Sequence, residues 1–431
     1  MDTSVNYLLT LQAVRERAKL VWEEAQAGNL SHFNLHLDNL NNVADYVASI
    51  IKRDFGPDKY GSIPPHGRWQ HFEVGGIPRI ANLIEQWKQQ GTDDKELARR
   101  LIDLFFVSVL LDAGAGDQWR YKEPGSEQTY ERSEGIAVAS YYMFTSMVFA
   151  SASSGAVSLV DGEGLKNLTG EKLKAGFQVS EANEMLGVES RAALLNRLGE
   201  SLLAHPQVFG REGRPGNAVD YMLGTADSSK NLDLLVFWDV LQALLVPIWP
   251  SNRTSINGLP VGDSWPLSTL QRRQHAAGSS DPTAGIQPFH KLTQWLTYSL
   301  MVPFERILGM EWKNADSLTA LAEYRNGGLF VDLGVLALKK EVAERGLEAS
   351  PGQLPLFDTG DDVIVEWRAM TVALLDVVYP LILAQIGDGV RLTIAQVLEA
   401  GTWKAGRELA AQRRPSTKSS PILIQSDGTV F

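Results

Sequence analysis

Apolar residues recur at spacings of three and four along most of this chain, and this periodicity constrains the fold more than any other feature. In the segment 4–52, for example, Leu37, Leu40, Val43 and Val47 fall on one face of a helix. Alternating strand patterns are scarce except in residues 413–431, where apolar residues surround a Ser-Asp-Gly turn. We therefore predict a mainly α, compact multi-helix fold with minor β structure at the C-terminus.

The length of the chain and its apolar content set the number of domains. With 431 residues and 44% hydrophobic residues, the chain can bury a large core. Charged residues make up 21%, which excludes wholesale disorder. No repeat of fixed period is present. We expect residues 1–431 to form a single large helical domain or two closely packed helical lobes.

Charge and residue usage exclude several classes of protein. The net charge of −11 argues against a nucleic-acid partner, which would require clustered Lys and Arg. The absence of cysteine removes disulfides, thiol nucleophiles and thiolate metal sites. The apolar runs 232–249 and 370–386 each contain an acid and a proline, so they are predicted to be buried helices and not membrane spans. The early charges are not those of a signal peptide, so we expect a cytoplasmic protein.

The stretch 285–336 carries the densest pattern of polar residues. On a helix over Pro288 to Leu300, the apolar residues form one side. The opposite side is a polar stripe made of His290, Lys291, Gln294, Thr297 and Tyr298. Such a helix has one side for the core and one side that can face a ligand.

A second pattern in this stretch is Glu323-Tyr324-Arg325 followed by Asn-Gly-Gly. We expect Gly327 and Gly328 to interrupt a helix with a tight turn. Backbone N–H groups at the start of the following helix, beside Arg325, would then hold an anion such as a phosphate. In the alternative interpretation the glycines only turn the chain and Arg325 pairs with a nearby acid.

Two loops add further candidates. The loop 55–79 is rich in Gly and Pro and contains His66 and Arg68. It is either a binding element or a surface cluster. The spacing of its two histidines and its glutamate matches no metal-ligand pattern. A second loop follows the predicted helix 95–111 and brings acids, an aromatic residue and a base to one helix end. Its candidates are Asp112, Asp117, Trp119 and Arg120, and Glu134 follows either as a helix-start residue or as part of the pocket.

Several long runs identify a family resemblance. The runs are HGRWQHFEVGG, LLDAGAGDQWRY, RSEGIAVASYYMF, PIWPSNRTSINGLPVGDSW, PFHKLTQWLTYSL, EYRNGGLFVDLGVL and SDGTVF. Over its whole length the chain resembles the uracil-catabolism protein family of fungi and bacteria, which works beside a GTP-cyclohydrolase-II-like enzyme and a uracil phosphoribosyltransferase. This resemblance implies a role in pyrimidine breakdown.

A narrower resemblance concerns residues 288–336 alone. This part is similar to the queuosine-nucleotide N-glycosidases, whose helical fold is related to DNA glycosylases, and it implies a DNA-glycosylase-like helical core. Lys291 and Gln294 match the family's aromatic-Lys-x-x-Gln motif, and Glu323, Tyr324 and Arg325 match its Asp-Tyr-Arg motif. The chain departs from the family in having Glu for Asp at 323, Asn-Gly-Gly for a proline-containing turn, and Ser299 where the family has an acid.

Together the resemblances imply an N-ribosyl hydrolase that cleaves the C–N glycosidic bond of a phosphorylated ribosylurea and releases urea. Glu323 or Asp112 would be the catalytic carboxylate, and Lys291 and Arg325 would bind the phosphate. The remaining expected pocket residues are His66, Arg68, Asp117, Trp119, Arg120, Glu134, His290, Gln294 and Tyr324. The substrate is a small phosphorylated riboside, and we expect neither a cofactor nor a metal.

Two other functions remain open from the sequence. An amidohydrolase would attack the ureido carbonyl and release ammonia, but such chemistry usually uses a metal or a Cys nucleophile. The chain has no cysteine, and its seven histidines are scattered. A non-catalytic binding or scaffold protein of the same pathway would need an exposed apolar patch. The sequence does not fix the oligomeric state.

Overall fold

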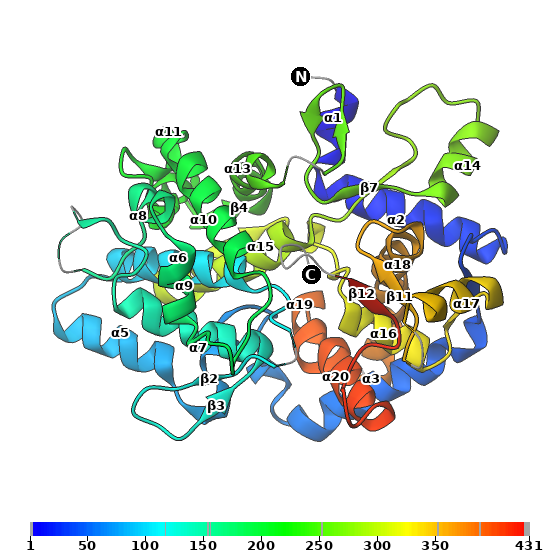
Figure 1. Cartoon of the computed structure of the whole chain (residues 1–431), viewed down its shortest axis with the longest axis horizontal. Coiled ribbons are helices and arrows are strands. Elements are labelled where there is room, and N and C mark those ends of the chain that lie inside the picture. The colour runs from blue at the N-terminus through cyan, green and yellow to red at the C-terminus, as the bar shows by residue number, and fades with distance from the viewer. Residues whose placement is uncertain are drawn as a thin grey trace. The chain divides into compact units, whose positions relative to one another are not determined.

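The computed structural model describes residues 3–116, 118–152, 155, 157–250, 253–350, 353–387 and 389–425. Helices dominate this part of the chain, and its strands occur only as two-stranded pairs (Figure 1). The prediction of a mainly α fold is therefore confirmed. The expected β-element near the C-terminus is present as β12 (Leu423–Gln425), which pairs in parallel with β11 (Leu356–Asp358). The predicted Ser-Asp-Gly turn lies outside the described residues.

The chain divides into two compact units, and each is built from separate segments. Unit 1 contains the described residues within 1–66, 251–294 and 316–426, and unit 2 those within 67–250 and 295–315. The helix α15 (Lys291–Leu308) contributes its first four residues to unit 1 and the rest to unit 2. Among the described residues the chain changes unit four times, so neither unit is a continuous stretch of sequence.

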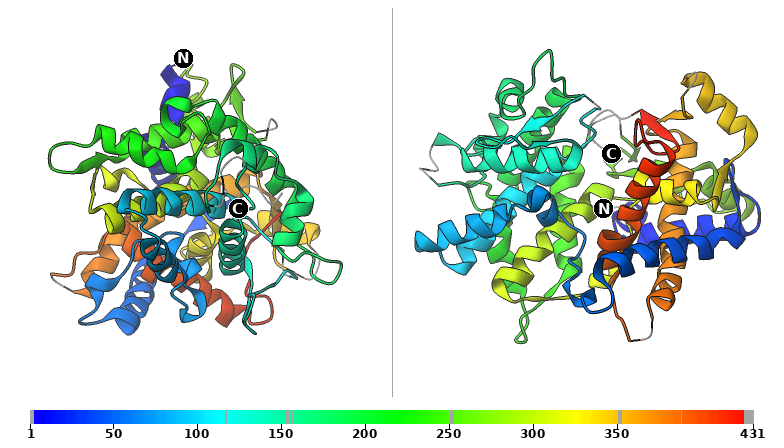
Figure 2. Two further views of the ribbon diagram at one scale, coloured as in Figure 1. Left: turned by 90° about the vertical axis from the view of Figure 1, so that its left-hand side faces the viewer. Right: turned by 90° about the horizontal axis from the view of Figure 1, so that it is seen from below.

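Unit 1 is organised around the long helix α18 (Asp362–Ile386). Asp361 caps this helix by accepting a hydrogen bond from the Val363 amide, and its apolar residues are buried on several sides. It packs against α2 (Leu11–Gln26), α3 (Leu40–Phe55) and α16 (Tyr324–Asp332), as the orange, blue and yellow ribbons of Figures 1 and 2 show. Among the described helices α18 has the length and hydropathy of a membrane span, but 56% of its apolar window is buried within the protein. The predicted buried helix at 370–386 is confirmed.

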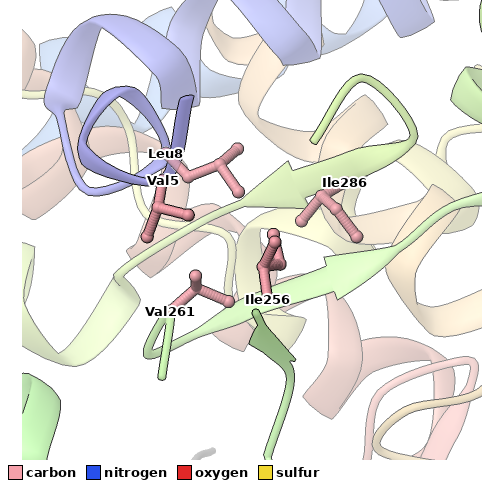
Figure 3. Packing of buried hydrophobic residues seen from close by; sticks show 5 residues of the cluster. All are labelled: Val5, Leu8, Ile256, Val261 and Ile286. Atoms are coloured by element: carbon pink, nitrogen blue, oxygen red, sulfur yellow. The ribbon is translucent and has the colours of Figure 1, made fainter. Parts of the chain in front are cut away.

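A small apolar cluster fixes the segment that leads into α15. Val5 and Leu8 of α1 (Thr3–Leu8) meet Ile256, Val261 and Ile286, and all five side chains are at least 90% buried (Figure 3). Ile286 begins β8 (Ile286–Pro288), which pairs with β7 (Ser264–Pro266). The residues after Pro288 therefore start from a rigid support.

The other helices and strands of unit 1 surround this core. Its remaining helices are α14 (Ser268–Ala276), α17 (Lys340–Ala349), α19 (Ile394–Val397) and α20 (Trp403–Arg413). Its remaining strand pairs are β1 (Phe33–Leu35) with β10 (Leu336–Leu338), and β5 (Ser255–Ile256) with β6 (Leu259–Pro260).

Unit 2 is built on the buried helix α6 (Asp94–Leu111). Asp93 caps it by accepting from the Glu96 amide, and every residue from Leu101 to Leu111 is buried. α6 packs on α7 (Arg132–Thr145) and α10 (Val188–Leu203). The other α-helices of unit 2 are α4 (Trp69–Phe72), α5 (Arg79–Gln89), α8 (Gly162–Lys166), α9 (Gly170–Gly176), α11 (Pro206–Phe209), α12 (Ala218–Thr225) and α13 (Leu234–Leu245). The strand pairs of unit 2 are β2 (Tyr121–Lys122) with β3 (Thr129–Tyr130), and β4 (Asn231–Asp233) with β9 (Glu311–Lys313).

Candidate functional site

The predicted site residues divide between the two units. Unit 1 holds His66, His290, Lys291, Gln294, Glu323, Tyr324 and Arg325, and unit 2 holds Arg68, Asp112, Trp119, Arg120 and Glu134. Asp117 lies outside the described residues.

In unit 1, Glu323 is the N-cap of α16. Its carboxylate accepts hydrogen bonds from the backbone N–H groups of Arg325 at 2.6 Å and Asn326 at 2.5 Å. The two oxygens keep further acceptor capacity, because a carboxylate has about four acceptor positions. The predicted anion site required a helix that begins after Gly327 and Gly328. Instead α16 begins at Tyr324, and Glu323 occupies the backbone N–H groups at that start, so the site is not formed in the predicted way.

The environment of Glu323 suits an acid–base group. The side chain is partly buried, and burial raises the pKa of its carboxyl group above the ordinary value. The two amide hydrogen bonds and the positive charges of Lys291 and Arg325 oppose that rise without cancelling it. Glu323 therefore keeps its proton to a higher pH than an exposed glutamate, and Lys291 lies within electrostatic reach of it.

The two glycines after Arg325 do not form a turn. Gly327 and Gly328 lie inside α16 with helical backbone, so the predicted interruption is wrong. A Cβ atom on Gly327 would lie 2.8 Å from Thr371 Oγ1 and 2.8 Å from the Trp367 ring, and one on Gly328 would lie 3.0 Å from Pro421. The glycines are therefore explained by close packing of α16 on α18 and on the segment before β12, and not by backbone reversal.

A buried ion pair that the sequence did not reveal holds the start of α15. Arg368 donates to both carboxylate oxygens of Asp263, at 2.9 and 2.8 Å, and Trp265 Nε1 donates to Oδ1 at 2.7 Å. Burial alone would raise the pKa of Asp263, but Arg368 and these hydrogen bonds lower it strongly. Asp263 Oδ2 also accepts from the backbone N–H of Lys291 at 3.0 Å. The pair thus fixes the backbone that carries Lys291.

Several other predicted residues of unit 1 are buried against protein partners. His290 is bonded through Nε2 to the Leu8 carbonyl at 2.7 Å, and burial lowers its pKa. Gln294 donates to Thr319 Oγ1 at 2.8 Å and accepts from the Thr319 amide at 2.8 Å. These bonds fix the start of α15 within unit 1. Of the polar stripe residues in this unit, His290 and Gln294 are therefore buried, whereas Lys291 is partly exposed.

Arg325 and His66 are also tied within unit 1. Arg325 Nη1 donates to the Lys418 carbonyl at 2.8 Å, and its guanidinium lies 5.0 Å from the centre of the Tyr324 ring. His66 Nδ1 lies 2.6 Å from Glu399 Oε2. Their predicted contacts with substrate stay predictions.

In unit 2, Arg68 and Asp112 form a buried pair at the end of α6. Arg68 Nη1 donates to Asp112 Oδ2 at 2.6 Å, and Nε donates to Ser108 Oγ at 2.8 Å. The Arg68 side chain is fully buried, whereas that of Asp112 is 11% exposed. Burial lowers the pKa of Arg68, while the charges of Asp112 and Glu134 oppose that shift. Two of the candidates from the sequence, Arg68 and Asp112, are thus in contact. Glu134 is close enough for its charge to affect the pKa of Arg68.

Arg191 is a further buried arginine that sequence reasoning missed. Its guanidinium donates to the carbonyls of Leu111 at 3.0 Å, Ala113 at 2.8 Å and Gly114 at 3.0 Å, and to that of Leu186. Burial lowers its pKa to about 10, and the charge of Asp112 opposes the shift. Arg191 therefore locks the backbone on both sides of Asp112.

The remaining candidates of unit 2 have different surroundings. Trp119 is fully buried, donates to the Phe177 carbonyl at 2.8 Å and packs edge-on against the Phe177 ring. Arg120 forms an exposed ion pair with Glu131 at 3.0 Å. Trp119 thus supports the core, and Arg120 lies at the surface.

Within the residues that the structure describes, no group of three or more His, Asp or Glu side chains is arranged to hold a metal ion.

Comparison with known proteins shows the family to which the chain belongs. The profile of a family described as "Protein of unknown function (DUF1688)" matches residues 7–431. The chain belongs to the DUF1688 family. It is 47% identical over 430 residues to "Protein urg3" of Schizosaccharomyces pombe, covering 99% of both chains. It is 45% identical over 446 residues to "Uracil catabolism protein 4" of Lachancea kluyveri, covering 100% of both. The expected resemblance to the uracil-catabolism protein family is confirmed, and the narrower resemblance of residues 288–336 to N-glycosidases stays a prediction.

Proposed function

We propose that this protein acts in uracil catabolism as an N-ribosyl hydrolase, with a phosphorylated ribosylurea as substrate. The place in uracil catabolism is supported by the name of the Lachancea kluyveri relative, which aligns over the full length of the chain. The hydrolytic activity is supported by Glu323, a carboxyl group whose pKa is raised by burial and which a helix N-terminus orients.

The reaction consumes one water and breaks one C–N bond. Water adds to the anomeric carbon of ribosylurea 5-phosphate, the bond from that carbon to the ureido nitrogen breaks, and ribose 5-phosphate and urea are released. Glu323 as carboxylate stabilises the positive charge that develops on the sugar and accepts one proton of the attacking water, while the departing ureido nitrogen takes up one proton so that neutral urea leaves. Lys291 and Arg325 supply positive charge for the phosphate, so that binding energy at this remote group supports the reaction. Asp112 is the alternative carboxylate.

The decisive experiment is an end-product assay. The purified protein is incubated with ribosylurea 5-phosphate, and urea, ammonia and ribose 5-phosphate are measured separately. Equimolar urea and ribose 5-phosphate without ammonia are expected. Ammonia in place of urea would instead establish an amidohydrolase, and stabilisation by the substrate without any turnover would establish a binding protein.

A further inference from the structure

One buried arginine of unit 1 contacts both chain segments that lead to the groups of the proposed reaction. Arg368 lies on α18, and its side chain is 3% exposed. Its Nη1 and Nη2 atoms donate to the two carboxylate oxygens of Asp263, at 2.9 and 2.8 Å. Its Nε donates to the carbonyl of Ala322 at 3.3 Å, and Ala322 directly precedes Glu323 in the chain. The same guanidinium therefore holds Asp263 on one side and the segment before α16 on the other.

Asp263 in turn holds three consecutive backbone N–H groups at the start of α15. Its carbonyl oxygen accepts from the amides of Phe289 at 2.8 Å and His290 at 3.3 Å. Its side-chain Oδ2 accepts from the amide of Lys291 at 3.0 Å. The Arg368 guanidinium also lies 3.9 Å from the centre of the Phe289 ring. Arg368 thus fixes this segment both through Asp263 and through its own contact with the ring.

The backbone of His290 has a conformation that its surroundings enforce. Its φ angle is 46°, in the left-handed region that residues with a side chain seldom adopt. Asp263 holds its amide, and its Nε2 lies 2.7 Å from the carbonyl oxygen of Leu8. Such a conformation persists only where several neighbours determine it together. It sets the direction in which the next residue, Lys291, enters α15.

Stability alone explains this arrangement poorly. A buried ion pair often contributes no more to stability than apolar side chains of the same size, because both charges lose their water. The Asp263–Arg368 pair instead provides a defined geometry, since Trp265 Nε1 also donates to Asp263 Oδ1 at 2.7 Å. The two segments that the pair joins carry Lys291 and Glu323, and the charge of Lys291 lowers the pKa of the Glu323 carboxyl group.

We propose that Arg368 is a positioning residue for Lys291 and Glu323: through Asp263 and the Ala322 carbonyl it sets the distance between the Lys291 ammonium group and the Glu323 carboxyl group. All five residues belong to unit 1. The catalytic value of this distance rests on the function proposed above, in which Glu323 reacts and Lys291 supplies charge for the phosphate.

Titration of Glu323 reports this distance without turnover. The protein is labelled with glutamate that carries ¹³C in the side-chain carboxyl group, and Glu323→Gln identifies the resonance of interest. The variants are Arg368→Lys, Lys291→Met and the two combined. Arg368→Lys keeps the positive charge but loses the planar fork that reaches both carboxylate oxygens and the carbonyl. Arg325 on α16, whose charge also acts on the Glu323 carboxyl group, is left in place.

Arg368→Lys should let the Lys291 ammonium group move away from Glu323. The pKa of Glu323 should then rise, in the same direction as in Lys291→Met and by less. The kcat for urea release should fall by about ten- to hundredfold, as for a reacting group held in the wrong place. The combined variant should titrate like Lys291→Met alone, because no ammonium group is left for Arg368 to place.

Arg79→Lys is the matched control for the loss of a buried arginine fork. Arg79 forms a bidentate pair with Glu123 in unit 2, at 2.7 and 2.6 Å, and its Nη1 donates to the carbonyls of Phe72 and Val74. None of these partners is a group of the proposed reaction. Arg79→Lys should therefore lower the unfolding temperature, as Arg368→Lys does, and leave kcat and the titration of Glu323 unchanged.

Two results would overturn the proposal. One is a Glu323 titration in Arg368→Lys that matches the wild type. The other is an equal shift with and without the Lys291 ammonium group, since Arg368 would then act on Glu323 directly. If Arg368→Lys does not fold, Trp265→Phe decides, because it removes one donor to Asp263 without changing any charge and should raise the pKa of Glu323 by a smaller amount. A shifted titration in a protein that releases no urea would support the positioning and reject the hydrolase.

Discussion

At the scale of single residues, Glu323 combines a structural and a chemical property. As the N-cap of α16 it accepts two backbone hydrogen bonds, and as a partly buried carboxyl group it has a raised pKa. These properties respond differently to substitution. A cap requires only a side-chain acceptor at the right distance, whereas acid–base chemistry requires an ionisable group placed against the substrate.

Two substitutions of Glu323 separate these roles. Glu323→Asp provides a shorter and stronger capping residue, so stability should be kept, while the displaced carboxyl group should lower kcat by about a hundredfold. Glu323→Gln keeps the length but not the ionisable group, and kcat should fall by about 10²- to 10⁴-fold. Urea release and thermal unfolding are measured on the same preparations. Full activity in Glu323→Gln would show that the residue is only a cap.

The charge of Lys291 gives a pH-dependent prediction. Lys291 lowers the pKa of Glu323, so removing its charge in Lys291→Met should raise that pKa further. The limb of the kcat–pH profile that follows deprotonation of Glu323 should then move to higher pH. Lys291→Arg, which keeps the charge, is the control and should leave the limb in place. A profile that Lys291→Met leaves unmoved would mean that Glu323 does not control the rate.

The sequence indicated which residues lie near one another where those residues belong to one recognised motif. Lys291 and Glu323 were selected together, and the structure places them within electrostatic reach. The Asp263–Arg368 pair was missed because its members are 105 positions apart. Arg191 was missed for a related reason, since its partners are backbone carbonyls, which leave no trace in the sequence.

At the scale of elements, the glycine pair of α16 shows why a local pattern can mislead. Adjacent glycines favour turns in isolation, but here Glu323 starts a helix and α18 leaves no room for side chains on the facing surface. The positions of α6, α13 and α18 followed from apolar periodicity. The distance between two packed helices does not follow from periodicity, because it depends on residues that are remote in sequence.

The packing of α16 on α18 yields a stability prediction. Gly327→Ala introduces a Cβ atom 2.8 Å from Thr371 Oγ1 and from the Trp367 ring, so we expect a loss of about 1–3 kcal/mol in the free energy of unfolding. Gly224→Ala in α12 is the matched control: no atom lies within 4 Å of its Cβ position, and alanine's helix propensity should stabilise the protein by up to about 1 kcal/mol. Denaturant unfolding measures both. Equal stability of the two variants would contradict the close packing.

At the scale of the whole molecule, the sequence predicted the helical class but not how the chain is partitioned. Apolar periodicity is a local signal, and it indicates which secondary structure each segment forms. Which segments share a core depends on long-range contacts, and the two units are each assembled from separate parts of the chain. In unit 2, β9 pairs with β4 across nearly eighty residues, and the Phe237 ring lies 5.8 Å from that of Phe304 and 5.4 Å from that of Trp312.

This partition predicts how fragments of unit 2 behave. Residues 67–250 alone lack the partner strand of β4, the aromatic neighbours of Phe237, and Ser299, which receives the Arg68 amide. We expect this fragment to retain helical circular dichroism but to unfold without a cooperative transition, because part of its core is missing. Joining residues 67–250 to 295–315 through a flexible linker of about 20 residues, which spans roughly 25 Å, should restore a cooperative transition. Calorimetry distinguishes the two, and a fragment 67–250 that melts as sharply as the linked protein would show that the segment 295–315 is dispensable for the core of unit 2.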